Sequence, residues 1–391
     1  METFILRWNT LEAWLLMAAG ALFVIQLLYY LLLYARIIFR NRAVKNERVN
    51  FNKEYPPLSV VICARDEAEH LRRNLTAVLE QDYPNFEVIV INDGNTDESE
   101  ACLTLLADRY PHLYHSFVPD SSRYVSRKKL AVTLAVKASK YDWLVFTEAN
   151  CRPASDQWLR LMARNFTSRT DIVLGYSGYE PHKGWLHRKI AFDNLFFSLR
   201  YLGCALVGAP YMGIGRNMAY RKELFFKQKG FSSHLHLKRG DDDLFVNETA
   251  RAGNTRVETD ARSATRMMPV EREKDWREER IGYISTARLY KGWQRSFLGL
   301  ETITRLLFYV AWIAVVVLAV LSRQWIVAGL AVSLFVVRYA VQLAVINLTA
   351  KTLGDERRYY FTLPLFDIVQ PILALKWKLS CLLRKKQEFM R

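Results

Sequence analysis

Residues 58–94 read LSVVICARDEAEHLRRNLTAVLEQDYPNFEVIVINDG and hold two short apolar runs with a helical pattern between them. The runs LSVVICA (58–64) and FEVIVIN (86–92) are rich in valine and isoleucine and do not alternate with polar residues. Such runs are typical of parallel strands that are buried on both faces. A strand, a helix and a second strand in this order predict a βαβ unit.

The same alternation continues along the chain. WLVFTE (143–148) and DIVLGYSG (171–178) are predicted as further buried parallel strands, and helical spacing recurs in residues 67–81, 96–110 and 127–139. The pattern predicts a doubly wound α/β sheet, in which ligands bind at the carboxyl ends of the strands.

Long apolar runs flank this region. Residues from about 11 to 39 are nearly all apolar, and roughly 20 such residues suffice to cross a bilayer. Two further spans, 303–321 and 326–348, are separated by a polar break at 322–324. The segment 359–383 contains prolines and charged residues, so we expect it to lie in the membrane interface rather than to span the bilayer.

The formal net charge is +16, and basic residues gather beside the apolar runs. These residues are Arg36, Arg40, Arg42, Lys45, Arg384, Lys385 and Lys386. Basic clusters of this kind bind anionic lipid at roughly 1 kcal/mol per residue, which favours a membrane surface as the anionic partner. The first run has its positive cluster on the downstream side, which predicts an uncleaved anchor with that side in the cytoplasm.

The spacing of residues argues against a nucleic-acid partner and against a disulfide framework. The sequence has no zinc-ligand spacing, no RNP-like run and no arginine-rich arm, so no nucleic-acid partner is expected. The five cysteines occur singly, without CxxC spacing, which predicts reduced thiols rather than a disulfide framework.

Polar residues follow three of the predicted structural elements. Asp93 and Gly94 come directly after the strand 86–92, a position that suits hydrogen bonding to a nucleotide. Taken alone, the residues fit an ordinary turn with Thr96 or Asp97 as helix cap better. Glu148 and Asn150 follow the strand 143–148. Their oxygens suit Mg²⁺ or Mn²⁺, but a capping loop would also have this sequence.

Three consecutive acidic residues, Asp241, Asp242 and Asp243, follow Gly240. Crowded carboxylates raise the pKa of one member, as a general base requires. A solvated acidic turn is the alternative interpretation.

Taken together, these motifs resemble a known family in their order and spacing. Six segments resemble the family-2 glycosyltransferases of GT-A fold. They are SVVICARDEAEHLRRNL, VIVINDGNTDES, KKLAVTLAVKAS, FTEANCRP, GIGRNMAYRKELF and GDDDLF. The resemblance covers about residues 57–248. It implies a Rossmann-like, mostly parallel sheet and transfer of a sugar from a nucleotide donor.

The resemblance also implies roles for individual residues. Ala64, Arg65, Glu67 and Asp93 would contact the nucleoside, and Lys128 or Lys129 would lie near the phosphates. Glu148 and Asn150 would hold a divalent metal, Mg²⁺ or Mn²⁺. Asp242 would be the catalytic base, with Asp241 as the second candidate. Asn217 and Asp243 are further expected substrate contacts.

The resemblance further implies an inverting transferase, with a UDP-sugar as the commonest donor and a lipid-linked or membrane-delivered acceptor. We expect an integral protein of a bacterial inner membrane, with its catalytic domain in the cytoplasm. The expected organisation is an anchor (1–45), a GT-A domain (46–268), an interfacial amphipathic helix (269–300), a transmembrane hairpin (301–350), and a membrane-associated segment with a basic tail (351–391).

The sequence departs from the family pattern in three places. Asn92 and Asn150 stand where aspartates are usual, and the QxxRW motif of processive synthases is missing from residues 276–293. A processive polysaccharide synthase and a catalytically impaired pseudo-glycosyltransferase, acting as a nucleotide-binding or scaffolding module, are therefore the alternative functions. For the helix within 269–300, docking on the catalytic domain is the alternative to a position in the membrane interface.

Overall fold

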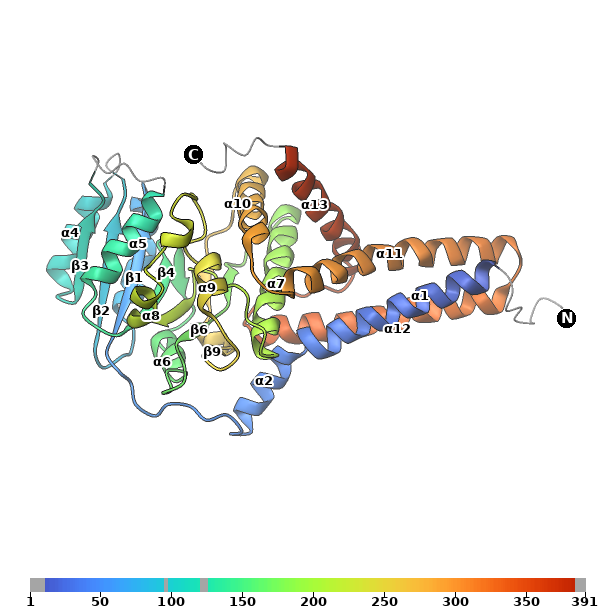
Figure 1. Ribbon diagram of the computed structural model, residues 1–391, viewed down its shortest axis with the longest axis horizontal. Coiled ribbons are helices and arrows are strands. Elements are labelled where there is room, and N and C mark those ends of the chain that lie inside the picture. Colours follow the sequence, from blue (N-terminus) through green and yellow to red (C-terminus); the bar gives the residue numbers. More distant parts are fainter. Residues whose placement is uncertain (1–10, 95–97, 120–125, 384–391) are drawn as a thin grey trace.

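The computed structural model describes residues 11–94, 98–119 and 126–383, which form a mostly parallel α/β domain joined to long apolar helices (Figure 1). Within these residues, one sheet has seven strands in the order β3-β2-β1-β4-β8-β6-β9. A smaller sheet has the order β5-β10-β7. The strands are β1 (Leu58–Ala64), β2 (Phe86–Asn92), β3 (Leu113–Phe117), β4 (Trp143–Glu148), β5 (Cys151–Pro153), β6 (Ile172–Leu174), β7 (Ser177–Tyr179), β8 (Met218–Arg221), β9 (Thr255–Val257) and β10 (Thr265–Met267).

Helices cover both faces of the large sheet. On one face, α5 packs against Val61, Ile89 and Phe146. On the opposite face, α3 and α4 pack against Val60 and Val88. This burial on both faces explains why β1, β2 and β4 are continuous apolar runs, and each has the predicted bounds. The helices of the α/β domain are α3 (Ala68–Leu79), α4 (Ser99–Arg109), α5 (Arg127–Ala138), α6 (Trp158–Ala163), α7 (Trp185–Leu206), α8 (Lys222–Lys227), η3 (Ser232–His234), α9 (Asp243–Thr249), η4 (Ala261–Ser263), α10 (Glu273–Thr286) and η5 (Ala287–Leu289).

The single strand predicted over 171–178 is wrong. The structure has β6 in the large sheet and β7 in the small one, with Gly175 between them. The two short strands have different partners, because β6 pairs with β8 and β9 whereas β7 pairs with β10. In addition, β6 is parallel to β9 but antiparallel to β8.

The strand order places a ligand crevice between β1 and β4. From β1 the chain continues to β2 and β3 on one side, whereas β4 lies on the other side, parallel to β1. At such a switch point the loops after the two strands diverge and leave a crevice at the carboxyl ends.

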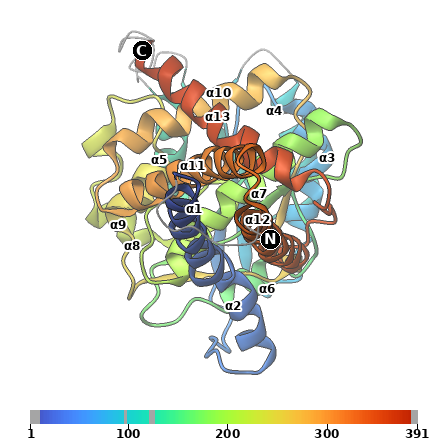
Figure 2. The ribbon, with the colours of Figure 1, turned by 90° about the vertical axis from the view of Figure 1, so that its right-hand side faces the viewer.

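Among the described residues, three helical segments are long and apolar enough to cross a membrane. They are Leu11–Lys45, which comprises α1 (Leu11–Leu28), the π-helical η2 (Tyr29–Tyr34) and α2 (Arg36–Lys45), together with α11 (Gln294–Leu321) and α12 (Trp325–Thr352). Figure 1 shows α1, α11 and α12 extending side by side away from the sheet, and Figure 2 views this bundle from its far end. The residues before Leu11 and the basic residues 384–386 lie outside the described residues.

A buried charge network joins the last helix, α13 (Leu363–Leu383), to this bundle. The carboxylate of Asp367 accepts hydrogen bonds from Arg338 (2.8 Å), Arg305 (3.3 Å) and Tyr309 (2.7 Å), which come from α11 and α12. Both arginines and Asp367 are at most 1% exposed. Because an unpaired charge is costly in such surroundings, this network fixes α13 against the bundle.

The network predicts the effect of Asp367→Ala. The substitution leaves the buried guanidinium of Arg338 without its carboxylate and that of Arg305 with Glu301 alone, which costs about 3–5 kcal/mol. We expect the thermal unfolding midpoint of the full chain in detergent to fall by several degrees. Asp275→Ala is the control, since it breaks an exposed pair with Arg272 that is worth at most about 1 kcal/mol. Equal midpoints for the two variants would show that the buried network does not stabilise the protein.

Candidate active site

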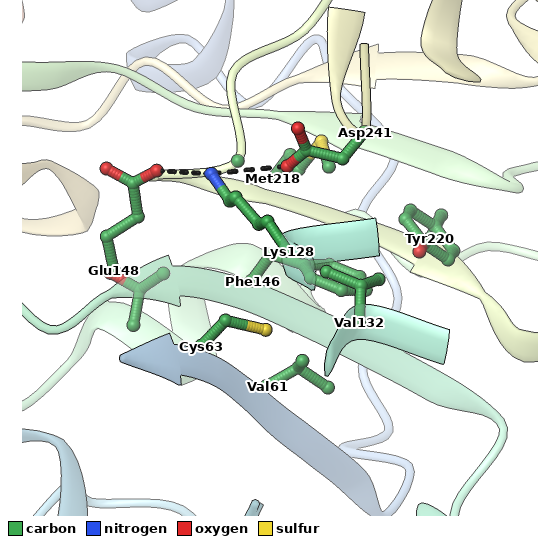
Figure 3. Close-up of a pocket in the computed structure, with 11 residues that line it drawn as sticks. Val61, Cys63, Lys128, Val132, Phe146, Glu148, Met218, Tyr220 and Asp241 are labelled. Carbon is green, nitrogen blue, oxygen red and sulfur yellow. Dashed lines mark hydrogen bonds and ion pairs between the residues drawn. The ribbon is translucent and has the colours of Figure 1, made fainter. Parts of the chain in front are cut away.

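The crevice at the switch point brings together most of the predicted site residues. A cleft there is lined by Ala64, Arg65, Glu67, Asp93, Lys128 and Glu148. A second pocket adjoins it and includes Lys128, Glu148, Gly215 and Asp241 (Figure 3). The convergence follows from topology, because the ends of parallel strands meet at one edge of the sheet.

The turn after β2 is held by Asn92 itself. Its side-chain oxygen accepts a hydrogen bond from the Gly94 N–H (3.2 Å), and its Nδ2 donates to the Gly94 carbonyl (3.0 Å). A Cβ atom at Gly94 would lie 2.7 Å from the backbone nitrogen of Asp66, so this position requires glycine. Asp93 therefore projects from a fixed turn, and its carboxylate pairs with Arg127, a residue that the sequence analysis did not select. Thr96 and Asp97, the alternative capping residues, lie outside the described residues.

Lys128 connects two acidic segments of the site. Its ammonium lies 2.8 Å from Glu148 Oε1 and 3.2 Å from Asp241 Oδ2 (Figure 3). Desolvation lowers the pKa of this ammonium, but attraction to Asp241 and Glu148 outweighs it and holds the pKa well above its ordinary value. The lysine is therefore a permanent positive charge in the cleft.

Glu148 is held from a second side by Arg216, which sequence analysis also missed. Arg216 Nε donates to Glu148 Oε2 at 2.9 Å, and its terminal nitrogens contact the carboxylate of Glu279 on α10 at 3.0 and 3.1 Å. Burial raises the pKa of Glu148, but Lys128 and Arg216 together lower it far more, so the carboxylate stays ionised. Arg216 precedes Asn217 in the motif GIGRNMAYRKELF, which is the signal that pointed to this segment.

The three acidic residues have three different environments. Asp241 faces the cleft and pairs with Lys128. Asp242 caps α9 by accepting from the Asp243 N–H (2.7 Å), and its Oδ2 accepts from the Gly215 N–H (2.9 Å) and the Tyr283 hydroxyl (3.2 Å). Burial and repulsion from Asp241 and Asp243 raise the pKa of Asp242 to about 7. A carboxyl group with this pKa can act as a base at neutral pH.

Asp243 does not face the cleft. It is 1% exposed, and its Oδ2 accepts hydrogen bonds from Tyr290 (2.6 Å) and Thr286. The expected substrate contact is therefore not supported, because the carboxylate holds the end of α10 and the residue after η5 against α9.

Lys129 and Asn217 are also placed inside the protein. The ammonium of Lys129 is fully buried and donates to the carbonyls of His234 and Leu237, and burial lowers its pKa to about 8. Of the two lysines that were alternatives for a phosphate contact, only Lys128 lines the cleft. Asn217 accepts from Trp158 (3.0 Å) and donates to the carbonyls of Tyr176 and Ser263, so it joins three segments of the core instead of contacting substrate.

The two expected metal ligands do not form a metal site with their neighbours. Both oxygens of Glu148 are paired with cationic side chains, and the Asn150 oxygen is neutral and lies 3.3 Å from the Cys151 sulfur. Within the described residues, no group of three or more histidine, cysteine, aspartate or glutamate side chains is placed to hold a metal ion. The residues present therefore do not fit a divalent ion held by Glu148 and Asn150.

The amphipathic helix expected within 269–300 docks on the catalytic domain. The structure has α10 there, and α11 already begins at Gln294. Trp276 is 1% exposed and donates to Asp193 of α7 (3.1 Å), as does Arg280 (2.5 Å). Docking was the alternative interpretation of this stretch, and it brings Tyr283 into contact with Asp242.

Comparisons with known proteins agree with this geometry. Residues 59–227 match the family model described as Glycosyl transferase family 2. The structure of mannosyltransferase PcManGT from Pyrobaculum calidifontis, in complex with GDP-Man and Mn²⁺, resembles the chain with a TM-score of 0.54 and 18% identity. That likeness covers 95% of this chain and 99% of the other, and at this identity it establishes the fold.

Two curated relatives match over short segments. An uncharacterized glycosyltransferase of Rickettsia prowazekii (strain Madrid E) is 38% identical over 61 residues, which is 15% of this chain and 19% of the relative. One from Haemophilus influenzae is 40% identical over 42 residues, which is 11% of this chain and 13% of the relative. The chain thus matches less than a fifth of the length of either relative.

The fold and the strand-end cleft define an α/β protein of the GT-A class. The matched domain identifies it further: residues 59–227 form a Glycosyl transferase family 2 domain.

The position of Asp243 predicts the effect of Tyr290→Phe. Loss of the hydroxyl removes a hydrogen bond to a buried carboxylate, which costs about 1–3 kcal/mol. We expect a lower thermal unfolding midpoint with unchanged binding of UDP or GDP. Tyr114→Phe, at an exposed tyrosine of β3, should change neither quantity. Weaker nucleotide binding at an unchanged midpoint would show instead that Asp243 acts in the cleft.

Proposed function

We propose that this chain is an inverting glycosyltransferase that moves a sugar from a nucleotide donor to an acceptor delivered at the membrane. The observation that carries the proposal is the position of Asp242, a buried carboxylate that accepts a hydrogen bond from the Gly215 N–H, behind a pocket lined by Gly215, Asp241 and Lys128 at the switch point of the sheet. The family of the matched domain supports the same class of reaction.

The proposed reaction is a direct displacement at the anomeric carbon. Asp242 takes the proton of the acceptor hydroxyl, whose oxygen forms a bond to the anomeric carbon. The bond from that carbon to the phosphate oxygen breaks, and the nucleoside diphosphate leaves with the electron pair. A single displacement inverts the anomeric configuration, by analogy with inverting glycosidases. Tyr283 and the Gly215 N–H orient the base, since both donate to its Oδ2.

Donor binding is assigned to the cleft. The phosphates are proposed to contact Lys128, and the nucleoside is proposed to contact Ala64, Arg65, Glu67 and Asp93. All five residues line the same cleft. A UDP-sugar is the proposed donor, on the basis of the resemblance to the family. A divalent metal is not given a step in this mechanism, because Glu148 and Asn150 do not fit one.

The apolar helices support delivery of the acceptor at a membrane. The segment Leu11–Lys45 and helices α11 and α12 are long enough to span it. The basic residues of α2 (Arg36, Arg40, Arg42 and Lys45) lie at the end of the bundle beside the catalytic domain (Figure 1). By the positive-inside rule this end, and with it the catalytic domain, is proposed to face the cytoplasm.

Asp242→Asn tests the base. The amide cannot take a proton, so transfer should fall by about 100-fold or more, within the range that general-base catalysis contributes. The assay is release of nucleoside diphosphate by the full chain in detergent or membranes, over a panel of UDP-, GDP- and CMP-sugars with membrane lipid as acceptor. Asp108→Asn, an exposed carboxylate on α4, should remain active. An active, folded Asp242→Asn protein would remove Asp242 from the mechanism.

The pKa of Asp242 predicts the pH dependence of transfer. The base works only when deprotonated, so the rate should rise with pH up to about 7 and level off above it. Tyr283→Phe removes a donor that stabilises the carboxylate, so its profile should move to higher pH. The measurement is the initial rate across pH for both proteins. An unmoved profile in Tyr283→Phe would show that this hydroxyl does not contact the base during catalysis.

A further inference from the structure

The ammonium of Lys128 lies between two carboxylates that come from different parts of the site. One is Glu148 at the end of β4, 2.8 Å away, and the other is Asp241 before α9, 3.2 Å away (Figure 3). Carboxylates that converge in this way from a strand end and a loop are the usual surroundings of a divalent cation beside a phosphate. In this chain the place between them is taken by a side chain that is itself a cation.

A divalent ion at this place would meet three obstacles. It would have to displace the ammonium from both carboxylates, and the displaced charge would remain nearby on the same flexible stem. It would also compete with Arg216, which holds the second oxygen of Glu148 at 2.9 Å. Finally, Asn150 offers a neutral amide oxygen in place of a third carboxylate, which weakens the attraction for a hard cation.

The ammonium is nevertheless available to a ligand in the cleft. The Lys128 side chain is 43% exposed and lines both the cleft and the adjoining pocket. An ammonium has three N–H donors, and contacts to Glu148 and Asp241 use two of them. The third is free to donate to a phosphate oxygen.

We propose that Lys128 stabilises the departing nucleoside diphosphate in place of a divalent metal ion, with Arg216 fixing Glu148 as the support of that lysine. This inference rests on the proposed transferase function. As the bond from the anomeric carbon to the phosphate oxygen breaks, the electron pair stays on the diphosphate, and the ammonium donates a hydrogen bond to the oxygen that gains charge. A donor already in place at a developing charge lowers the barrier without reorganisation.

Two measurements on the full chain in detergent test this inference. The first is binding of UDP and GDP by calorimetry, in EDTA and in Mn²⁺. The second is release of nucleoside diphosphate from the panel of sugar donors under the same two conditions. Each is repeated with Lys128→Met and with Lys137→Met, an exposed lysine of the same helix that serves as the matched control.

We expect diphosphate binding and donor turnover in EDTA, both unchanged by Mn²⁺. Lys128→Met should lower turnover by about 100-fold, the usual effect of removing one donor from a developing oxyanion. The same variant should weaken binding, while Lys137→Met should match the parent. Thermal unfolding midpoints establish that the variants are folded.

The remaining outcomes separate the two proposals. Turnover that requires Mn²⁺, or that survives in Lys128→Met, overturns the inference and leaves the transferase function standing. The absence of donor turnover under every condition counts against the transferase function. In that case the binding of UDP and GDP decides whether the inference about Lys128 holds. The inference about Lys128 is overturned if diphosphate binding requires Mn²⁺, if Lys128→Met leaves binding unchanged, or if the chain binds no diphosphate.

Discussion

The contact of Lys128 with Glu148 and Asp241 joins the two halves of the catalytic domain. Glu148 ends β4 in the parallel half of the sheet, whereas Asp241 belongs to the loop before α9, which packs over the antiparallel strand β8. Without a cation between them, the carboxylates of Glu148 and Asp241 would repel each other. The shape of the cleft therefore depends on the ammonium of Lys128, which is also proposed to contact the ligand.

The acidic run 241–243 shows how crowded charges can be kept in one loop. Asp241 is neutralised by Lys128, and Asp243 is hydrogen-bonded by Tyr290 and Thr286. Asp242 lies between them with neutral donors only, so burial and the repulsion from its two neighbours raise its pKa. The hydroxyls of Tyr283 and Thr286 come from α10 and that of Tyr290 from the residue after η5, shortly before α11 begins at Gln294. The geometry of Asp242 is thus linked to the segment that leads into the long apolar helix α11.

The central part of the fold was predictable because burial on both faces leaves a direct mark on the sequence. Three strands, β1, β2 and β4, have the predicted bounds for this reason. The edge strand β3 was missed, since only Leu113 of its five residues is buried. The split between β6 and β7 follows from their different partners, β8 and β9 for the first and β10 for the second, which lie far away in the sequence and leave no mark on the local pattern.

The same distinction between local patterns and distant contacts applies to the residues of the site. Residues at strand ends were predictable, because topology alone places Ala64, Asp93 and Glu148 at one edge. The partners that decide what each side chain does come from elsewhere: Arg216 for Glu148, and Tyr283 for Asp242. Asn92 shows that a departure from the family pattern need not disable a site. Its amide donates to the Gly94 carbonyl, which a carboxylate cannot do, and so it holds the turn from which Asp93 reaches the cleft.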